Sequence, residues 1–326
     1  MPLPDAMPAS PRRGARLRMQ LLAWLLLAMP AVAQEAFMQQ LTRQFADSKI
    51  EFPRTGSNAP FVPLAYMGAT SYGSADVDGR DGGSLEYDVT TVSQYATLPL
   101  LLGERDALII GDYLSWSDFS VKGEERNSFD VTSVGLPVGW LRQIDPAWQA
   151  AAFVMPMGHY DNSAGGSWTW QYMGGVFARY VQHERLWWAF GFYADIAPGD
   201  NFYIPYLGAS WVINEYWTLT AVMPWPALLY APTRDWLVRL GASPSGSSWS
   251  FQPGSGEAAI NLDAWDFGLG VERRLAGNIW LSAEAGVGGF RGLSLSGSDV
   301  NAPEVDVGSS PYVGININFR PSLINP

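Results

Sequence analysis

The feature that most constrains this chain is the alternation in length of the connections between its apolar segments. From Val62 onward, segments of about 8–17 residues rich in Tyr, Trp, Phe, Val and Thr are separated in turn by a tight charged turn and a longer loop rich in Gly, Ser, Asp and Asn. Gly103–Asp106 and Ala276–Asn278 are such turns, and Ser74–Ser84 and Ser294–Val307 are such loops. This asymmetry is typical of membrane barrels whose turns face the periplasm and whose loops face outside.

The spacing of these segments predicts an all-β fold, a transmembrane antiparallel β-barrel of about 14 strands. Merging the two weak central segments, 216–223 and 225–231, gives the alternative of 12 strands, and the alternation of turns and loops survives either way. The expected strands are 64–75, 84–101, 107–121, 127–142, 147–160, 167–182, 186–197, 202–212, 216–223, 225–231, 235–251, 259–275, 278–293 and 308–319.

Period-two alternation within these segments predicts one apolar, lipid-facing side of the wall. In 265–275, Trp265, Phe267 and Leu269 share one parity, while Asp266 and Glu272 share the other. Because Trp and Tyr prefer the two interfaces of a bilayer, their position near strand ends predicts two aromatic girdles. The girdle candidates are Tyr95, Trp116, Trp140, Trp148, Trp168, Tyr180, Trp188, Trp211, Trp217, Trp236, Trp265, Trp280 and Tyr312.

Residues 1–33 have the pattern of a secretory signal peptide. Four arginines precede the apolar run Leu21–Met29, and Ala31 and Ala33 form an A-x-A cleavage site, so the mature chain should begin at Gln34. An uncleaved membrane helix is the weaker alternative, because the apolar run is short and ends at Pro30. No later apolar run has the length of a membrane helix, which directs the exported barrel to the cell outer membrane, with outer-membrane lipids and the barrel-assembly machinery as partners.

The remaining boundaries follow from composition. Residues 34–61 should form a periplasmic helix, Glu35–Asp47, and a linker; the helix either lies as an arm near the inner rim or plugs the lumen. The barrel spans 62–319, and 320–326 form a C-terminal tail. A formal net charge of −11 argues against nucleic-acid binding, and the absence of cysteine excludes disulfides, thiolate metal sites and a lipoprotein anchor.

The last predicted strand carries the pattern of the β-signal by which outer-membrane proteins are recognised for insertion. Its key positions are Tyr312, Gly314, Ile317 and Phe319. Alternation predicts that Val313, Ile315, Ile317 and Phe319 face lipid, while Gly314, Asn316 and Asn318 face the lumen.

The C-terminal third also resembles a known family. The segment Trp211–Phe251, with its Met223-Pro224-Trp225-Pro226 motif, and the strands around Gly268–Glu272 and Leu281–Gly286 resemble an uncharacterised family of bacterial outer-membrane β-barrels, a domain of unknown function. The resemblance implies a barrel and brings no assigned activity, cofactor or catalytic residue.

The predicted lumen suggests passage or binding of small solutes. Acidic residues outnumber basic ones among its candidate ionisable positions, so a water path should favour cations. Those positions are Glu86, Asp88, Arg179, Asp195, Asp266, Glu272 and Glu284. Inward Phe153, Met155 and Phe177 would also suit an amphipathic or aromatic solute. A closed structural barrel whose loops serve adhesion is the alternative.

Catalysis and metal binding have weaker signals, and we expect neither an enzyme nor a cofactor. The one hydrolase candidate pairs His159 with Ser163 or Ser167 near the outer end of a strand, whereas His183 should be solvated in a turn. The loop Asp76–Gly82 is acidic but lacks calcium-loop order, since Arg80 stands at its fifth position and Tyr87 at its twelfth.

Overall fold

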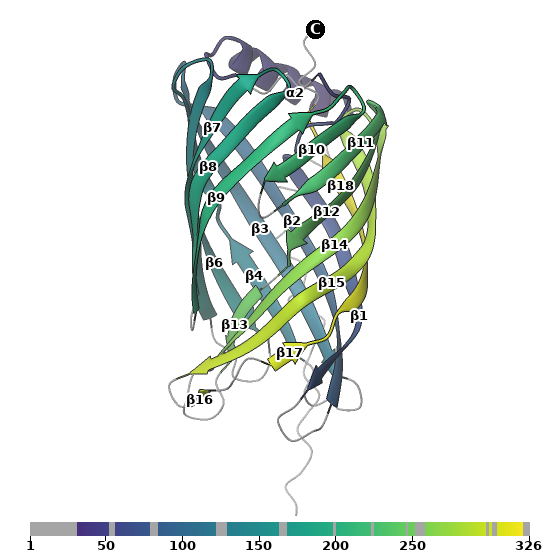
Figure 1. The fold of residues 1–326 in the computed structure, drawn as a ribbon. Coiled ribbons are helices and arrows are strands. Elements are labelled where there is room, and N and C mark those ends of the chain that lie inside the picture. Colours follow the sequence, from purple (N-terminus) through teal and green to yellow (C-terminus); the bar gives the residue numbers. More distant parts are fainter. Residues whose placement is uncertain are drawn as a thin grey trace, which may run out of the picture.

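A computed structural model describes residues 31–51, 56–78, 84–121, 129–162, 168–197, 200–222, 225–245, 247–251, 258–297, 300–301 and 305–321. One helix, α2 (Ala31–Ala46), precedes a single antiparallel sheet that closes into a barrel (Figure 1). The strands are β1 (Ala65–Asp78), β2 (Ser84–Leu101), β3 (Asp106–Val121), β4 (Phe129–Gly135), β5 (Val138–Gln143), β6 (Trp148–Asp161), β7 (Trp168–His183), β8 (Leu186–Ala197), β9 (Asp200–Val212), β10 (Trp217–Val222), β11 (Ala227–Thr233), β12 (Trp236–Pro244), β13 (Ser247–Phe251), β14 (Ala258–Ala276), β15 (Ile279–Gly297), β16 (Val300–Asn301), β17 (Val305–Val307) and β18 (Ser310–Phe319).

The barrel wall has 14 strands, as the alternation of turns and loops predicts. The 18 strands named above make 14 because β16 and β17 extend β18 along β15, and two predicted segments are each divided into two consecutive pieces. β4 and β5 both pair with β3 and β6 across a break at Leu136 and Pro137, and β12 and β13 both pair with β14. Pro137 lacks an amide hydrogen, which explains the break in the ladder. The predicted segments 216–223 and 225–231 form the separate strands β10 and β11, so the twelve-strand alternative is wrong.

Pairing of the first and last strands closes the barrel. β1 lies antiparallel to β18 in a continuous register from Ala65 opposite Phe319 to Tyr72 opposite Tyr312, and β1 pairs with β2 on its other side. Neighbouring strands are otherwise consecutive in the chain, which is the simple up-and-down order. The short turns gather at one end of the barrel, here called the turn end, and the opposite end is called the loop end. At the turn between β14 and β15, Gly277 has a φ of 53°, a conformation that favours glycine.

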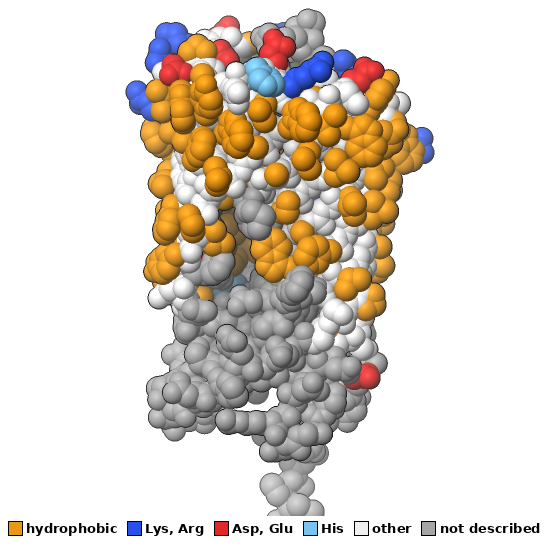
Figure 2. Space-filling model, viewed as in Figure 1, with side chains coloured by type: hydrophobic (Ala, Val, Ile, Leu, Met, Phe, Trp, Pro, Cys, Tyr) orange, Lys and Arg blue, Asp and Glu red, His pale blue; other side chains and the backbone are white. Residues whose placement is uncertain are grey.

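The outer surface of the wall is apolar. Along β7, Trp168, Trp170 and Tyr172 are exposed and Thr169 and Gln171 between them are buried, which identifies the outward and inward parities. Hydrophobic side chains cover most of the described face in Figure 2, and charged side chains gather at the turn end. Soluble monomers rarely expose so continuous an apolar surface, whereas a bilayer requires it. The protein is therefore an outer-membrane β-barrel, and the predicted fold class and localisation are confirmed.

Several predicted girdle residues do lie exposed near strand ends, including Trp140, Trp148, Trp168, Trp211, Trp217 and Trp236. Three others face inward. Trp280 is buried beside Leu237 and Ala231, the Tyr95 hydroxyl donates to the Pro63 carbonyl, and Tyr312 reaches a carboxylate inside the barrel. Their parity, not their distance from the strand end, decides their environment.

Helix α2 lies along the rim of the turn end (Figure 1). Its apolar residues Met38, Leu41 and Phe45 form one buried cluster with Ala65 of β1 and Phe319 of β18. Spacings of three and four residues place these side chains on one helix face. No helix among the described residues is long and apolar enough to cross a bilayer.

Candidate functional site

The interior surface of β6–β9 carries a cluster of aromatic rings. Phe153 of β6 stacks with Phe177 of β7 at 5.9 Å between ring centroids and with Tyr193 of β8 at 6.3 Å. Phe177 also meets Tyr206 of β9 edge-on at 5.1 Å. All four positions have inward parity, so the rings form an aromatic wall facing the lumen.

Two glycines create the space for these rings. Gly175 lies opposite both Phe153 and Tyr193 in the sheet register, and Gly191 lies opposite both Phe177 and Tyr206. A Cβ at Gly175 would come within 2.7 Å of the Phe177 ring, and one at Gly191 within 2.5 Å of it. The aromatic rings therefore lie across strands at positions where the intervening strand has no side chain.

A chain of polar side chains lies on the same wall, nearer the loop end. Ser133 Oγ is 2.8 Å from His159 Nδ1, and His159 Nε2 is 2.9 Å from Gln171 Oε1. Gln171 Nε2 donates to both carboxylate oxygens of Asp195 at 2.8 Å. Ser133, His159 and Gln171 are all buried. The hydrogen bonds link one side chain from each of four strands, β4, β6, β7 and β8.

A second network lies on the opposite part of the wall, between β1, β14, β15 and β18. The Tyr72 hydroxyl donates to Asp266 at 2.5 Å, and the Tyr312 hydroxyl donates to Glu284 at 2.5 Å. The two tyrosine rings lie 5.5 Å apart, and Arg239 Nη1 is 3.9 Å from Glu284 Oε1. Asp266 and Glu284, predicted to face the lumen, thus have the inward parity and hold specific tyrosine partners.

Glu272 is neutralised by an arginine from the predicted tail. Arg320 Nη2 lies 2.6 and 2.8 Å from the two Glu272 carboxylate oxygens, and Arg320 Nη1 donates to the Phe61 carbonyl at 2.6 Å. Asn318 also donates to Glu272 at 3.3 Å. Since both charged groups are buried at the turn end, Glu272 adds no net charge to the lumen.

The linker after α2 contacts the interior at the turn end. Glu51 donates its amide to Gln143 Oε1 at 3.0 Å, and its carbonyl accepts from Gln149 and Arg179 at 2.9 Å each. On the other side of the ring, the Thr218 hydroxyl bonds to Ser57 and the Asn58 amide to the Glu215 carbonyl. At the rim, the Lys49 ammonium, hydrogen-bonded to Glu104, lowers the pKa of that carboxyl. A cavity of about 140 Å³ lies beside Gln149, Arg179 and Phe177.

Two of the predicted lumen positions are wrong. Glu86 and Asp88 share the parity of the exposed Val92 on β2, whereas the buried Val89 between them packs with Phe119 and Val131 inside. In the loop-end half of β2, the sequence prediction therefore exchanged the inward and the outward positions. Glu86 is exposed.

The four β-signal residues occupy different environments. Ile317 is exposed on the outer surface, as are Val313 and Ile315, while Tyr312 faces inward and Gly314 lies opposite Thr70. Phe319 has the outward parity but is fully buried in the cluster with α2, so the expectation that it faces lipid is wrong. The helix covers this last strand position.

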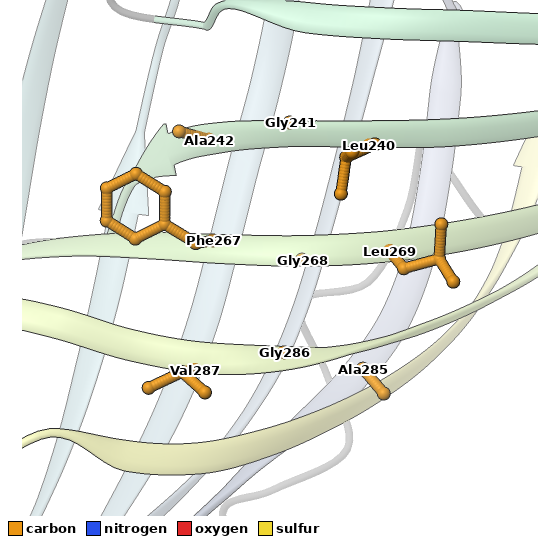
Figure 3. Close-up of a pocket in the computed structure, with 9 residues that line it drawn as sticks. All are labelled: Leu240, Gly241, Ala242, Phe267, Gly268, Leu269, Ala285, Gly286 and Val287. Atoms are coloured by element: carbon orange, nitrogen blue, oxygen red, sulfur yellow. The ribbon is translucent and has the colours of Figure 1, made fainter.

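The outer wall also has a shallow apolar groove over β12, β14 and β15. Gly241, Gly268 and Gly286 stand opposite one another in the register and form its floor, and Leu240, Phe267, Leu269 and Val287 rise beside it (Figure 3). Its volume is about 390 Å³. The groove is lined by apolar side chains and opens on the outer wall, the side that faces lipid in a bilayer.

His159 has a different partner from the one predicted. Its ring bonds Ser133 and Gln171, whereas Ser163 and Ser167 lie outside the described residues, as does most of the loop Asp76–Gly82. His183 lies in the turn between β7 and β8, where its Nδ1 accepts from the Arg185 amide. In the described part of the chain, no three His, Asp or Glu side chains are grouped to hold a metal ion.

Sequence reasoning missed Ser133, Gln171, Tyr72 and Arg320. Each is a polar residue in a strand or just after one, and each bonds a side chain of another strand, 12 to 194 residues away in the chain. Inward parity on β4 and β7 is the one signal that could have marked Ser133 and Gln171.

No protein-family model matches the chain, and no curated protein matches its sequence. Solved structures resemble it in fold. An outer-membrane channel from Pseudomonas putida F1 is 12% identical with a TM-score of 0.41, over 83% of this chain and 99% of that one. A Pseudomonas aeruginosa FadL homologue is 12% identical with a TM-score of 0.40, over 78% and 89%. The toluene transporter TodX of Pseudomonas putida is 11% identical with a TM-score of 0.36, over 80% and 90%.

Proposed function

We propose that this protein is an outer-membrane channel for small amphipathic or aromatic solutes, with a modest preference for cations. The interior surface of β6–β9 carries the proposal. It combines the aromatic rings of Phe153, Phe177, Tyr193 and Tyr206 with hydrogen-bonding side chains nearer the loop end. A solute that has a ring and a polar group can pack its ring on these aromatic side chains. Its polar group can exchange hydrogen bonds to water for hydrogen bonds to the polar side chains.

The balance of inward charge supports the cation preference. Glu272 is paired with Arg320. Of the other inward charges described above, three are carboxylates, those of Asp195, Asp266 and Glu284, and two are guanidinium groups, those of Arg179 and Arg239. A lumen lined by more carboxylates than guanidinium groups attracts cations.

The test is the double variant Asp266→Asn with Glu284→Gln in planar bilayers. Both amides keep an oxygen that can accept from Tyr72 and Tyr312, so we expect a folded barrel whose reversal potential in a salt gradient shifts toward zero. Glu86→Gln is the matched control, because it removes one negative charge on the outward side and should leave selectivity unchanged.

An unchanged reversal potential in the double variant would reject the cation preference. The absence of any conductance from the wild-type barrel would instead favour the alternative, a closed structural barrel. Either protein should first be shown to be folded by its heat-modifiable migration on gels.

A further inference from the structure

One buried network in the barrel has a fixed hydrogen-bond direction. Asp195 can only accept, so the Gln171 amide nitrogen must face it, at 2.8 Å from both carboxylate oxygens. The Gln171 carbonyl oxygen then faces His159, 2.9 Å from Nε2. The opposite amide orientation would place two acceptors against each other.

This direction determines the histidine tautomer. Because Gln171 Oε1 accepts from Nε2–H, a neutral His159 has its lone pair on Nδ1. Ser133 Oγ lies 2.8 Å from that atom and is therefore the donor. A serine hydroxyl donating to an oriented neutral imidazole, with a carboxylate beyond it, is the arrangement that activates a serine for attack.

We infer that Ser133 is a nucleophilic serine with His159 as its general base, acting on small esters that enter the barrel. Ser133 Oγ forms a bond to the ester carbonyl carbon while its proton passes to His159 Nδ1. The ester C–O bond then breaks, and the departing alcohol takes that proton from His159. Water cleaves the acyl-serine in the same way, with His159 again as base, and releases the carboxylic acid. Water is the only co-reactant.

Gln171 is a positioning residue in this scheme. It touches His159 and Asp195 but not Ser133 among its described side-chain bonds, and it holds the imidazole in the required tautomer. Asp195 favours the imidazolium that forms when His159 takes the proton.

The surroundings indicate an uncharged aryl or short acyl ester as the substrate class. Phe153 and Tyr193 face the lumen on the same strands as His159 and Asp195 and can pack against an apolar group. Asp195 disfavours an anionic substrate nearby. A fluorophosphonate reports on such a serine because it reacts covalently with activated serine hydroxyls.

The purified full-length barrel is incubated with a fluorophosphonate probe, and the labelled residue is mapped by mass spectrometry. We expect the label on Ser133, none on Ser133→Ala, and a labelling rate at least about 100-fold lower for His159→Gln. Gln171→Leu should also slow labelling although the barrel stays folded. Ser115→Ala is the matched control and should label as the wild type does, since Ser115 is a buried inward serine on neighbouring β3.

The same samples are assayed for hydrolysis of p-nitrophenyl acetate. Release of p-nitrophenol above the Ser133→Ala level supports the inference. Absence of label from the folded wild type, or equal labelling of Ser133→Ala, overturns it and leaves the network a purely structural link between strands. Since mapping on the wild type needs no variant, poor folding of Ser133→Ala does not prevent a decision. Conductance of the wild type is measured separately, so failure of the hydrolytic role and failure of the channel role give different results.

Discussion

At the scale of single residues, the interior is organised by inward glycines that face tyrosine and phenylalanine rings. Gly175 and Gly191 make room for the rings of β6–β9, and Gly268 and Gly286 do the same for Tyr312. The ring of Tyr312 crosses Gly286, and its hydroxyl reaches Glu284 near Gly268. The absence of a side chain at Gly268 of β14 thus leaves room for the hydroxyl group of Tyr312 from β18, two strands away.

We predict that Gly268→Ala destabilises the barrel by about 1–3 kcal/mol. A Cβ there would stand 2.0 Å from the Tyr312 hydroxyl and 2.5 Å from Glu284 Oε1, so the Tyr312 ring and the Glu284 carboxylate must shift, which disturbs the bond between them. Gly270→Ala on the same strand is the control, because its nearest atom is 3.7 Å away. Urea unfolding of the two variants in lipid vesicles measures the difference, and equal midpoints would show that the ring packing contributes little.

At the scale of elements, α2 and β18 depend on each other. Leu41 of the helix and Phe319 of the last strand belong to one buried cluster, so the helix stabilises the strand that closes the barrel. Phe319, a residue of the predicted β-signal, therefore also packs in the buried cluster with the helix. A polar tail residue, Arg320, extends the same strand end and pairs with Glu272.

We predict that Phe319→Ala costs about 3–5 kcal/mol and Leu41→Ala about 2–5 kcal/mol of stability, each lowering the level of heat-modifiable barrel. Because the two side chains share a cluster, the double variant should cost less than the sum. Gln40→Ala, an exposed position on the same helix, is the control and should have little effect. Strict additivity of the two variants would contradict the coupling.

The processing site lies within the same element. We predict that the mature chain begins at Gln34, because Ala31 and Ala33 form an A-x-A site after an apolar run. Cleavage there would remove the first residues of α2 and keep Met38, Leu41 and Phe45, which make the cluster. N-terminal sequencing of protein from the outer-membrane fraction tests this. An intact leader would refute it.

The elements were more predictable from the sequence than their contacts were. Alternation and turn length are local properties, so the fourteen strands and the inward parity of Asp266 and Glu284 could be deduced from the residues. Where the alternation of polar and apolar residues is weak, as at Glu86 and Asp88, outward residues were predicted to face the lumen. The pairing of Ser133 with His159 depends on the residue-by-residue register between the paired strands β4 and β6, which alternation alone does not specify.

At the scale of the whole molecule, the barrel combines an apolar outer wall, a lining of two polar networks and a turn end whose wall contacts the described linker residues. Glu51 is held by β5, β6 and β7, while Ser57 and Asn58 are held by β10 and by the turn before it. The described linker residues therefore contact the interior wall at two separate places of the turn end. If the lumen conducts, Glu51, Ser57 and Asn58 lie beside its path at the turn end.

We predict that Gln143→Ala with Arg179→Ala raises single-channel conductance, because these are two of the three side chains that hold Glu51 at the turn end, and their loss both removes bulk from the interior wall and loosens Glu51. Removing Arg179 also takes a positive charge from the lumen, which should increase cation preference in the same recordings. Arg142→Ala is the matched control. It removes an arginine on the outward side of β5, bonded to Asp106, and should change neither quantity. A conductance equal to that of the wild type, with the double variant folded, would show that the linker does not limit the path. In that case the narrowest part of the conduit must lie elsewhere along the interior, and the aromatic rings of β6–β9 become the next positions to test.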